Sequence, residues 1–292
     1  MNQAERRIYL IEKLLQENQR YHGTPIPAEE SEQRRLLRGL MNVRSPLAIS
    51  DDFLQVQDAY LREELERRGV VSVEDLSPRA DGLYLWQGDI TRLKCSAIVN
   101  AANSSLTGCY IPGHNCIDNC IHTFAGLQLR LTCAEIIKEQ GFEEPTGQAK
   151  ITPGFNLPCE YILHTVGPIV RGRLTQQDCQ LLASCYNSCL KLANKHKCES
   201  IAFCCISTGV FGFPQQEAAE IAVQTAREFL AGSVNFKEVI HAPHSPDNAT
   251  EFSSNTSGTG HTTTDSAGPQ ALKKIIFNVF KDEDRRIYEK LL

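Results

Sequence analysis

The sequence predicts an α/β protein in which helices cover both faces of a central mixed sheet, preceded by a helical extension. From about residue 83 onward, short apolar runs alternate with segments of helical periodicity, as expected for a sheet covered by helices. Before that point the apolar residues recur at helical spacing. We therefore expect an N-terminal helical extension over residues 1–78 and an α/β domain over residues 79–292.

The composition is typical of a soluble cytoplasmic protein. The chain has 292 residues, of which 41% are hydrophobic, so it can bury a substantial core. No apolar run reaches the length of a membrane span, and the start lacks the uncharged apolar core of a signal peptide. A net charge of -5 argues against a general nucleic-acid binder. The 12 cysteines are expected to stay reduced and to pack in the core or bind metal.

The predicted elements follow the chain in order. Helices of the extension are expected over residues 4–19, after Pro27 and over 52–68. Strands buried on both faces have continuous apolar runs, and these occur at residues 83–86, 97–99, 161–166, 201–206 and 275–280. Further helices are expected over residues 118–140, 177–196, 215–230 and 282–292.

One segment has neither kind of pattern. Residues 244–270 are rich in Ser, Thr, Asn and Gly and nearly free of apolar side chains, which predicts a disordered surface insertion. Three histidines lie in or near it, His241, His244 and His261, and isolated histidines in such a segment are more typically solvated than metal-bound.

Polar loops follow several of the predicted strands, at the edge of the sheet where ligands bind in such folds. Gly209 and Gly212 lie in a loop whose composition suits either an anion site or a plain strand-to-helix turn. Asp89 is either a loop-capping carboxylate or an acceptor for an exocyclic amine. Asn103 is either an Asx-turn residue or a contact to a sugar hydroxyl.

A short loop carries the residues of a possible metal site. Cys109, His114 and Cys116 bring two thiols and an imidazole within eight residues, a ligand set that suits zinc. Three protein ligands with an open fourth position is the arrangement of catalytic zinc. The alternative is that these cysteines are small buried hydrophobic side chains, and the spacing does not decide between the two. Whether Cys120 adds a fourth ligand is also left open.

Four motifs taken together resemble the macrodomain family, which binds ADP-ribose. In chain order they are Gly88-Asp89-Ile90-Thr91, Asn100-Ala101-Ala102-Asn103, Asp118-x-x-Ile121-His122-x-x-Ala125-Gly126 and Ser207-Thr208-Gly209-Val210-Phe211-Gly212. The loop with Cys109, His114 and Cys116 resembles the metal loop of the zinc-containing subfamily of protein ADP-ribosyl hydrolases, which also has a helical N-terminal extension. The resemblance implies a macrodomain-type three-layer α/β/α fold with one Zn²⁺ per chain.

The resemblance also implies a role for each matching residue. Asp89 and the Ile90 backbone would bind adenine, and Asn103 with the metal loop would approach the distal ribose. The pyrophosphate would lie between two sets of residues: Ser207, Thr208, Gly209, Val210 and Phe211 on one side, and Asn119, Cys120 and Ile121 on the other. The chain departs from the common macrodomain pattern where the Cys/His segment replaces the glycine-rich run before the helix.

The implied reaction is hydrolysis of the bond between the anomeric carbon of ADP-ribose and a protein side chain, most simply an acidic one. Asn103 and Asp118 are the catalytic candidates. Asp118 would orient or deprotonate a water, or cap the following helix, or do both. Zinc would generate hydroxide or position the ribose, and we favour positioning.

Two other functions stay open at this stage. One is a module that binds ADP-ribose without cleaving it, and the other is a hydrolase of small ADP-ribose derivatives. The expected partner of a hydrolase is an ADP-ribosylated protein.

Overall fold

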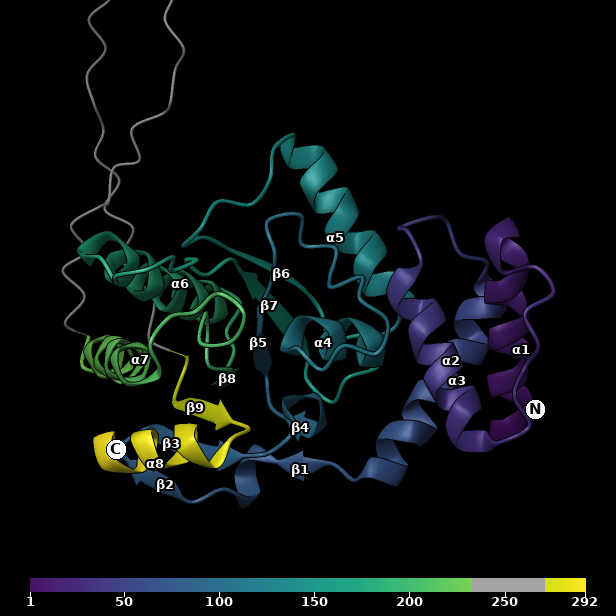
Figure 1. Ribbon diagram of the computed structural model, residues 1–292. Coiled ribbons are helices and arrows are strands. Elements are labelled where there is room, and N and C mark those ends of the chain that lie inside the picture. The colour runs from purple at the N-terminus through teal and green to yellow at the C-terminus, as the bar shows by residue number, and fades with distance from the viewer. Residues whose placement is uncertain (233–270) are drawn as a thin grey trace, which may run out of the picture.

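The computed structural model describes residues 1–232 and 271–292 (Figure 1). The predicted insertion at 244–270 and the three histidines in or near it lie outside the described residues. No helix in the described ranges is long and apolar enough to cross a membrane.

The three predicted helices of the extension are present. They are α1 (Gln3–Glu17), α2 (Glu30–Val43) and α3 (Asp51–Arg68). Asn2 and Glu5 form a capping box at the start of α1, and the Ser50 hydroxyl accepts from the Phe53 N–H at the start of α3. The apolar faces of the three helices meet in a core of their own, which also contacts Leu127 of the following domain.

Within the described residues, the main sheet has seven strands in the order β2-β3-β9-β8-β5-β7-β6. The five central strands are parallel and are those predicted from apolar runs: β3 (Leu83–Gln87), β5 (Ala97–Ala101), β7 (Tyr161–Thr165), β8 (Ser200–Phe203) and β9 (Lys274–Val279). Antiparallel strands close both edges, β2 (Pro78–Ala80) and β6 (Ala149–Pro153). Two short strands, β1 (Val71–Ser72) and β4 (Leu93–Lys94), pair separately.

The sheet lies between two layers of helices. One layer consists of α6 (Gln176–Lys195), α7 (Gln215–Leu230) and α8 (Asp282–Leu291), and the other of α4 (Ile117–Ala125) and α5 (Leu127–Gln140). Side chains alternate between the faces of each strand, so Ile201 and Phe203 pack with the first layer and Ala202 with the second.

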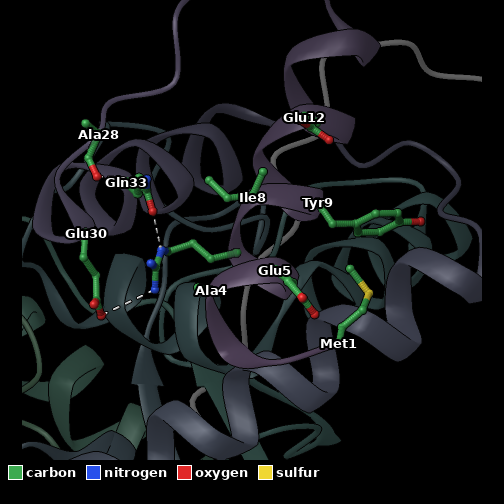
Figure 2. A pocket seen from close by; sticks show the side chains of 10 residues that line it. Met1, Ala4, Glu5, Ile8, Tyr9, Glu12, Ala28, Glu30 and Gln33 are labelled. Carbon is green, nitrogen blue, oxygen red and sulfur yellow. Dashed lines mark hydrogen bonds and ion pairs between the residues drawn. The ribbon is translucent and has the colours of Figure 1, made fainter.

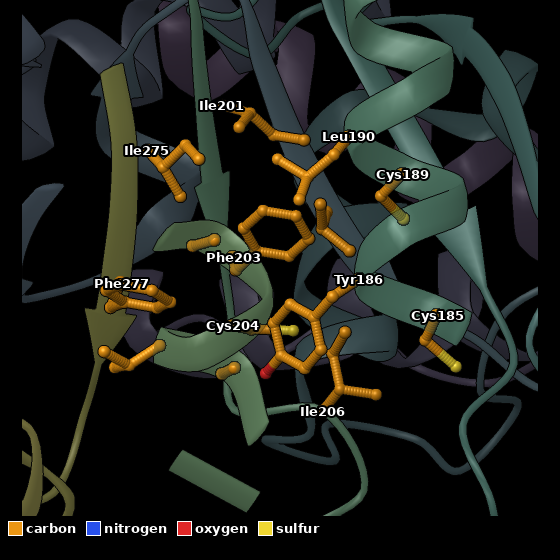
Figure 3. Close-up of a cluster of buried hydrophobic side chains, with 14 of the residues drawn as sticks. Cys185, Tyr186, Cys189, Leu190, Ile201, Phe203, Cys204, Ile206, Ile275 and Phe277 are labelled. Atoms are coloured by element: carbon orange, nitrogen blue, oxygen red, sulfur yellow. The ribbon is translucent and has the colours of Figure 1, made fainter. Parts of the chain in front are cut away.

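The first interlayer core is built around an aromatic pair. Tyr186 of α6 lies with its ring centroid 4.8 Å from that of Phe203, and Cys189 lies nearby on the same helix (Figure 3). Together, the mixed sheet, the helix layers on its two faces and the three N-terminal helices confirm the predicted three-layer α/β/α fold.

Two details of the sequence prediction were wrong. The helix predicted over 118–140 is two helices, because Gly126 between them adopts φ 102° and ψ 169°. Such a backbone conformation interrupts a helix and is accessible essentially to glycine. The edge strands β2 and β6 were also not predicted, because their short sequences alternate with polar residues and lack an apolar run.

Candidate functional site

The predicted site loops meet at one edge of the sheet because they follow parallel strands. The loop after β3 begins at Gly88, that after β5 at Ala102, and that after β8 at Cys204. The loop after β5 contains residues 109–116, which we call the metal loop, and leads directly into α4. This is the edge at which sheets of this kind bind ligands.

The metal loop brings its three predicted ligands together. The ligand atoms of Cys109, His114 and Cys116 lie within 4.8 Å of one another, and the Cys109 Sγ is 3.6 Å from the His114 Nδ1. All three residues are half-buried. Two sulfur atoms and an imidazole nitrogen at this spacing fit a thiophilic cation such as zinc. Cys120 is not part of this cluster, and its Sγ lies 3.6 Å from the Arg38 Nη2.

Cys116 also has a structural role as the N-cap of α4. Its Sγ accepts a hydrogen bond from the Asn119 N–H at 3.4 Å. Burial raises the pKa of the Cys116 thiol to about 12, against the lowering effect of that N–H. A cation bound here would therefore have to displace the thiol proton.

Asp118 lies in the first turn of α4 with its side chain buried. Its Oδ1 accepts a hydrogen bond from the Asn100 Nδ2 at 2.8 Å, and the His122 Nε2 lies 3.6 Å from the same oxygen. Burial raises the pKa of the Asp118 carboxyl to about 6, although the Asn100 hydrogen bond and the Arg130 charge oppose this effect. The N-cap is Cys116, so the alternative role of Asp118 as the cap is not what the structure shows.

A second group of potential metal ligands lies behind Asp118. The ligand atoms of His122, Cys133 and His164 are within 4.8 Å of one another, and all three residues are buried. The His164 ring is already engaged, because its Nδ1 lies 3.2 Å from the Asn100 Nδ2 and its Nε2 lies 3.0 Å from the Thr152 Oγ1. Burial lowers the pKa of His164 to about 3, so the ring is neutral. We interpret His164, with the Cys133 Sγ 3.8 Å from its Nε2, as part of a hydrogen-bonded network that supports Asp118 through Asn100. Within the described residues, neither ring nitrogen of His122 has a hydrogen-bond partner.

Asn100 and His164 were not predicted as site residues. Each is a polar residue within a strand that is otherwise buried and apolar. That local contrast is the signal from which they could have been found. Both are fully buried, so their hydrogen bonds are needed to offset the cost of removing them from water.

Asn103 lies at the entrance to the metal loop. Its Nδ2 donates to the Gly108 carbonyl at 3.0 Å, and its Oδ1 accepts from the Ser105 hydroxyl at 2.7 Å. Gly108 has φ 84°, and a Cβ at this position would lie 2.7 Å from the His122 ring. Only glycine allows the backbone to pass so close to that ring. In the sequence, Asn103 precedes the metal loop and Asp118 follows it.

The loop after β8 has the geometry expected of an anion site. Ser207 adopts a positive φ of 64°, and the Phe213 N–H returns to the Ser207 carbonyl at 3.0 Å. In the described part of the chain, the N–H groups of Gly209, Val210 and Phe211 have no hydrogen-bond acceptor. Unpaired N–H groups preceding a helix suit the oxygens of a phosphate. The assignment of Ser207 to Phe211 to the pyrophosphate stays a prediction.

Asp89 has the loop-capping role that was one of its two interpretations. Its Oδ1 accepts from the Thr91 N–H at 3.0 Å, and its Oδ2 accepts from the Arg68 Nη1 at 3.0 Å. Ile90 is almost fully buried behind it. A contact of Asp89 and the Ile90 backbone with adenine stays a prediction.

The three residues of α4 that were predicted to contact the pyrophosphate have different surroundings. Asn119 is buried, and its Nδ2 donates to the carbonyls of Cys109 and Ile111, so this side chain holds the metal loop. Ile121 is buried in the core between the sheet and α4. A pyrophosphate contact from Asn119, Cys120 or Ile121 stays a prediction.

A surface pocket lies in the N-terminal extension rather than at this edge (Figure 2). It is lined by residues of α1 and the start of α2, and inside it the Arg7 Nε donates to the Gln33 Oε1 at 2.9 Å. Arg7 also pairs with Glu30 at 3.4 Å. Arg7, Gln33 and Glu30 of the pocket are thus joined to one another, and its lining has no Cys/His set comparable to that of the metal loop.

Known proteins resemble this chain in sequence and in structure. The Macro domain family profile matches residues 99–222. A protein-ADP-ribose hydrolase of Treponema medium is 53% identical over 296 residues, covering 100% of both chains. A protein-ADP-ribose hydrolase of Staphylococcus aureus (strain MSSA476) is 45% identical and covers 96% of this chain and 92% of its own length.

Two solved structures share the fold. The Trypanosoma brucei macrodomain in complex with ADP-ribose superposes with a TM-score of 0.58 at 28% identity, covering 87% of this chain and 94% of its own. The Oceanobacillus iheyensis macrodomain with ADP superposes with a TM-score of 0.54 at 33% identity, covering 73% and 91%. The chain belongs to the Macro domain family.

Proposed function

We propose that this chain is a zinc-dependent hydrolase that removes mono-ADP-ribose from acidic side chains of modified proteins. The observation that carries the proposal is the three-ligand cluster of the metal loop, which lies in the sequence between Asn103 and the buried Asp118. The full-length relatives named protein-ADP-ribose hydrolases support the reaction class. ADP-ribose would be the bound ligand, and an ADP-ribosylated protein the substrate.

The chain would hold one Zn²⁺ through Cys109, His114 and Cys116. A bound zinc ion would supply positive charge, either to fix the hydroxyls of the distal ribose or to lower the pKa of a water. We favour fixation of the ribose. An acyl linkage has a good leaving group, so that positioning and a weakly activated water suffice.

The residues of the chain would carry the remaining steps. Asp118 would orient a water toward the anomeric carbon and accept its proton as the new carbon–oxygen bond forms. The bond from that carbon to the side-chain carboxylate breaks, and the carboxylate leaves with the bonding electrons. Asn103 would hold the distal ribose beside the metal loop. The products are ADP-ribose and the free acidic side chain.

The decisive test is single-turnover release of ADP-ribose from a mono-ADP-ribosylated protein. We expect release by the zinc-loaded protein and its loss after chelation or in Cys116→Ala, with ADP-ribose binding retained. Cys179→Ala on α6 is the matched control, because it removes a half-buried thiol in the opposite helix layer.

The same experiment separates the alternative functions. Tight ADP-ribose binding without any release from the loaded protein would leave a binding module. Turnover of a free ADP-ribose ester or phosphate monoester, without release from protein, would indicate a small-molecule hydrolase.

A further inference from the structure

Helix α2 of the N-terminal extension contacts the metal loop directly. The Arg38 Nη2 donates to the His114 carbonyl at 2.7 Å, and the Asn42 Oδ1 accepts from the Gly113 N–H at 2.9 Å. The partners are 76 and 71 residues apart in the sequence. Both contacts are therefore made by the fold rather than by local turn geometry.

These two contacts belong to a larger hydrogen-bonded network between α2 and α4. Arg38 also donates to the Asn119 Oδ1 at 3.1 Å. Asn119 in turn donates to the carbonyls of Cys109 at 3.2 Å and Ile111 at 2.9 Å. The Asn42 Nδ2 donates to the Thr123 Oγ1 at 2.8 Å, and both side chains are buried.

The loop itself has few internal contacts that could hold its shape. It forms no helix or strand, and Gly113 adopts a positive φ of 66°. In the described structure, the backbone hydrogen bond that closes within residues 109–116 runs from the His114 N–H to the Ile111 carbonyl at 3.2 Å. The shape of the loop thus depends on side chains from outside it.

The contacts from α2 are not simply the seam between the extension and the domain. That seam combines the apolar contact of the extension core with Leu127 and hydrogen bonds of Gln57 and Arg130 that do not involve residues 109–116. Arg38 and Asn42 instead contact the backbone of one predicted ligand and of the residue before it. Contacts of this kind determine where ligand atoms lie and how far they move when a cation binds.

We propose that Arg38 and Asn42 are positioning residues that hold the metal loop in its ligand geometry. The N-terminal extension is then a part of the metal site and not only a cover for the domain. This inference rests on the proposed function, because it assumes that the cation of that function binds in the loop.

Arg38→Met tests the inference, since methionine keeps an apolar stem of similar length and removes all the donors. We expect zinc affinity, measured by competition with a chromophoric chelator, to fall about 10- to 100-fold, as when outer partners of metal ligands are removed. Asn42→Asp is a second variant that keeps an acceptor for Gly113 and loses the donor to Thr123. It should weaken zinc binding less than Arg38→Met.

Arg35→Met is the matched control, because Arg35 lies on the same helix, is exposed and, among the described residues, pairs with Glu32 at 3.3 Å. It should leave zinc affinity unchanged. Thermal unfolding of each variant shows whether the fold is retained.

Hydrogen–deuterium exchange of the metal-free proteins gives a readout that does not depend on zinc. Amides of residues 109–116 should exchange faster in Arg38→Met than in the wild type or in Arg35→Met. Zinc affinity and loop exchange that are both equal to wild type would overturn the inference. Failure of the wild type itself to bind zinc would overturn the proposed cofactor, and exchange would still test the positioning of the loop.

Discussion

At the scale of single residues, Asp118 is held by a chain of hydrogen bonds that starts in an edge strand. Since the Asn100 amide nitrogen can only donate, the His164 Nδ1 must accept, which places the ring proton on Nε2 beside Thr152. Asn100 uses its second amide hydrogen for the Asp118 Oδ1. This arrangement requires a neutral His164, consistent with the lowering of its pKa by burial. The position of the carboxylate is thus determined by residues on β5, β6 and β7.

Substitution of Asp118 by Asn should separate catalysis from binding. The amide has nearly the same shape but cannot accept a proton from water, so we expect single-turnover release to fall by about 10²- to 10⁴-fold. ADP-ribose affinity, measured by calorimetry, should change only slightly. Asp52→Asn in the exposed first turn of α3 is the control. Release by Asp118→Asn at the wild-type rate would exclude Asp118 as the group that accepts the proton.

At the scale of elements, Gly126 is both the C-cap of α4 and the N-cap of α5, so the conformation of one glycine sets the directions of two helices. A Cβ at position 126 would lie 2.6 Å from the Gln128 Oε1 and 2.7 Å from the Gln57 Nε2. Gln57 belongs to α3 and also accepts a hydrogen bond from the Leu127 N–H at 2.9 Å. The break therefore also lies where α3 of the extension contacts the domain.

Gly126→Ala should destabilise the protein by about 1–3 kcal/mol, because alanine is strained at this φ and its methyl group displaces both amides. Urea unfolding measures the change in the free energy of unfolding. Gly209→Ala is the control, since a Cβ there meets nothing within 4 Å. An equal effect of the two substitutions would mean that the backbone at position 126 is not strained.

Most elements could be predicted because they depend on local patterns. The apolar runs of β3, β5 and β9 and the amphipathic face of α1 are visible in the sequence itself. The break at Gly126 could not be predicted, because a single glycine inside a helical pattern is often tolerated. Likewise, β2 and β6 each pair with the next strand along the chain, but their own short sequences carry no apolar run by which they could be recognised.

One carboxylate joins all three N-terminal helices. Glu64 of α3 accepts hydrogen bonds from Gln3 of α1 at 3.0 Å and from Arg34 of α2. Burial alone would raise the pKa of Glu64, but the hydrogen bonds from Arg34, Gln3 and Arg67 outweigh it and lower the pKa to about 2. The ionised form of Glu64 therefore stabilises the helix packing.

Acid should consequently weaken the extension. Because the folded-state pKa lies below the unfolded value, the stabilisation is complete above about pH 4.5 and is lost as pH falls toward about 2. We expect a loss of about 3 kcal/mol across that range, measured as the free energy of urea unfolding against pH. Glu64→Gln should flatten this dependence. Glu63→Gln, at a half-exposed position, should leave it in place, and equal slopes for both variants would contradict the assignment to Glu64.

At the scale of the whole molecule, the site could be predicted where one loop supplies its residues or where loops follow parallel strands of one sheet. Cys109, His114 and Cys116 are close in sequence, so their association was visible before the fold was known. Arg38 and Arg68 come from other helices of the extension, and nothing in their local sequence connects them to the site. Long-range contacts of this kind can be identified only from the three-dimensional structure.

Arg130 joins the domain directly to the extension. It lies on α5, is buried, and donates to the carbonyls of Met41 at 3.2 Å, Asn42 at 2.8 Å and Arg44 at 2.5 Å. These carbonyls lie at the end of α2, where a cation is favourable and where backbone acceptors lack helical partners. Arg130 also donates to the Thr107 carbonyl at 2.7 Å, just before the metal loop.

Removal of this guanidinium should uncouple the two parts of the molecule. Arg130→Ala leaves several buried carbonyls without a donor, so we expect a loss of at least about 3 kcal/mol in the free energy of unfolding. Trp86 is the single tryptophan and lies on β3, so its fluorescence follows the sheet, while far-UV circular dichroism follows all the helices. In the wild type and in the exposed-site control Arg35→Ala, the two urea transitions should coincide. In Arg130→Ala the circular dichroism transition should begin first, because the extension then separates before the sheet unfolds. Coincident transitions in that variant would show that the remaining contacts, among them Leu127 and the hydrogen bond from Gln57, are enough to couple the extension to the domain.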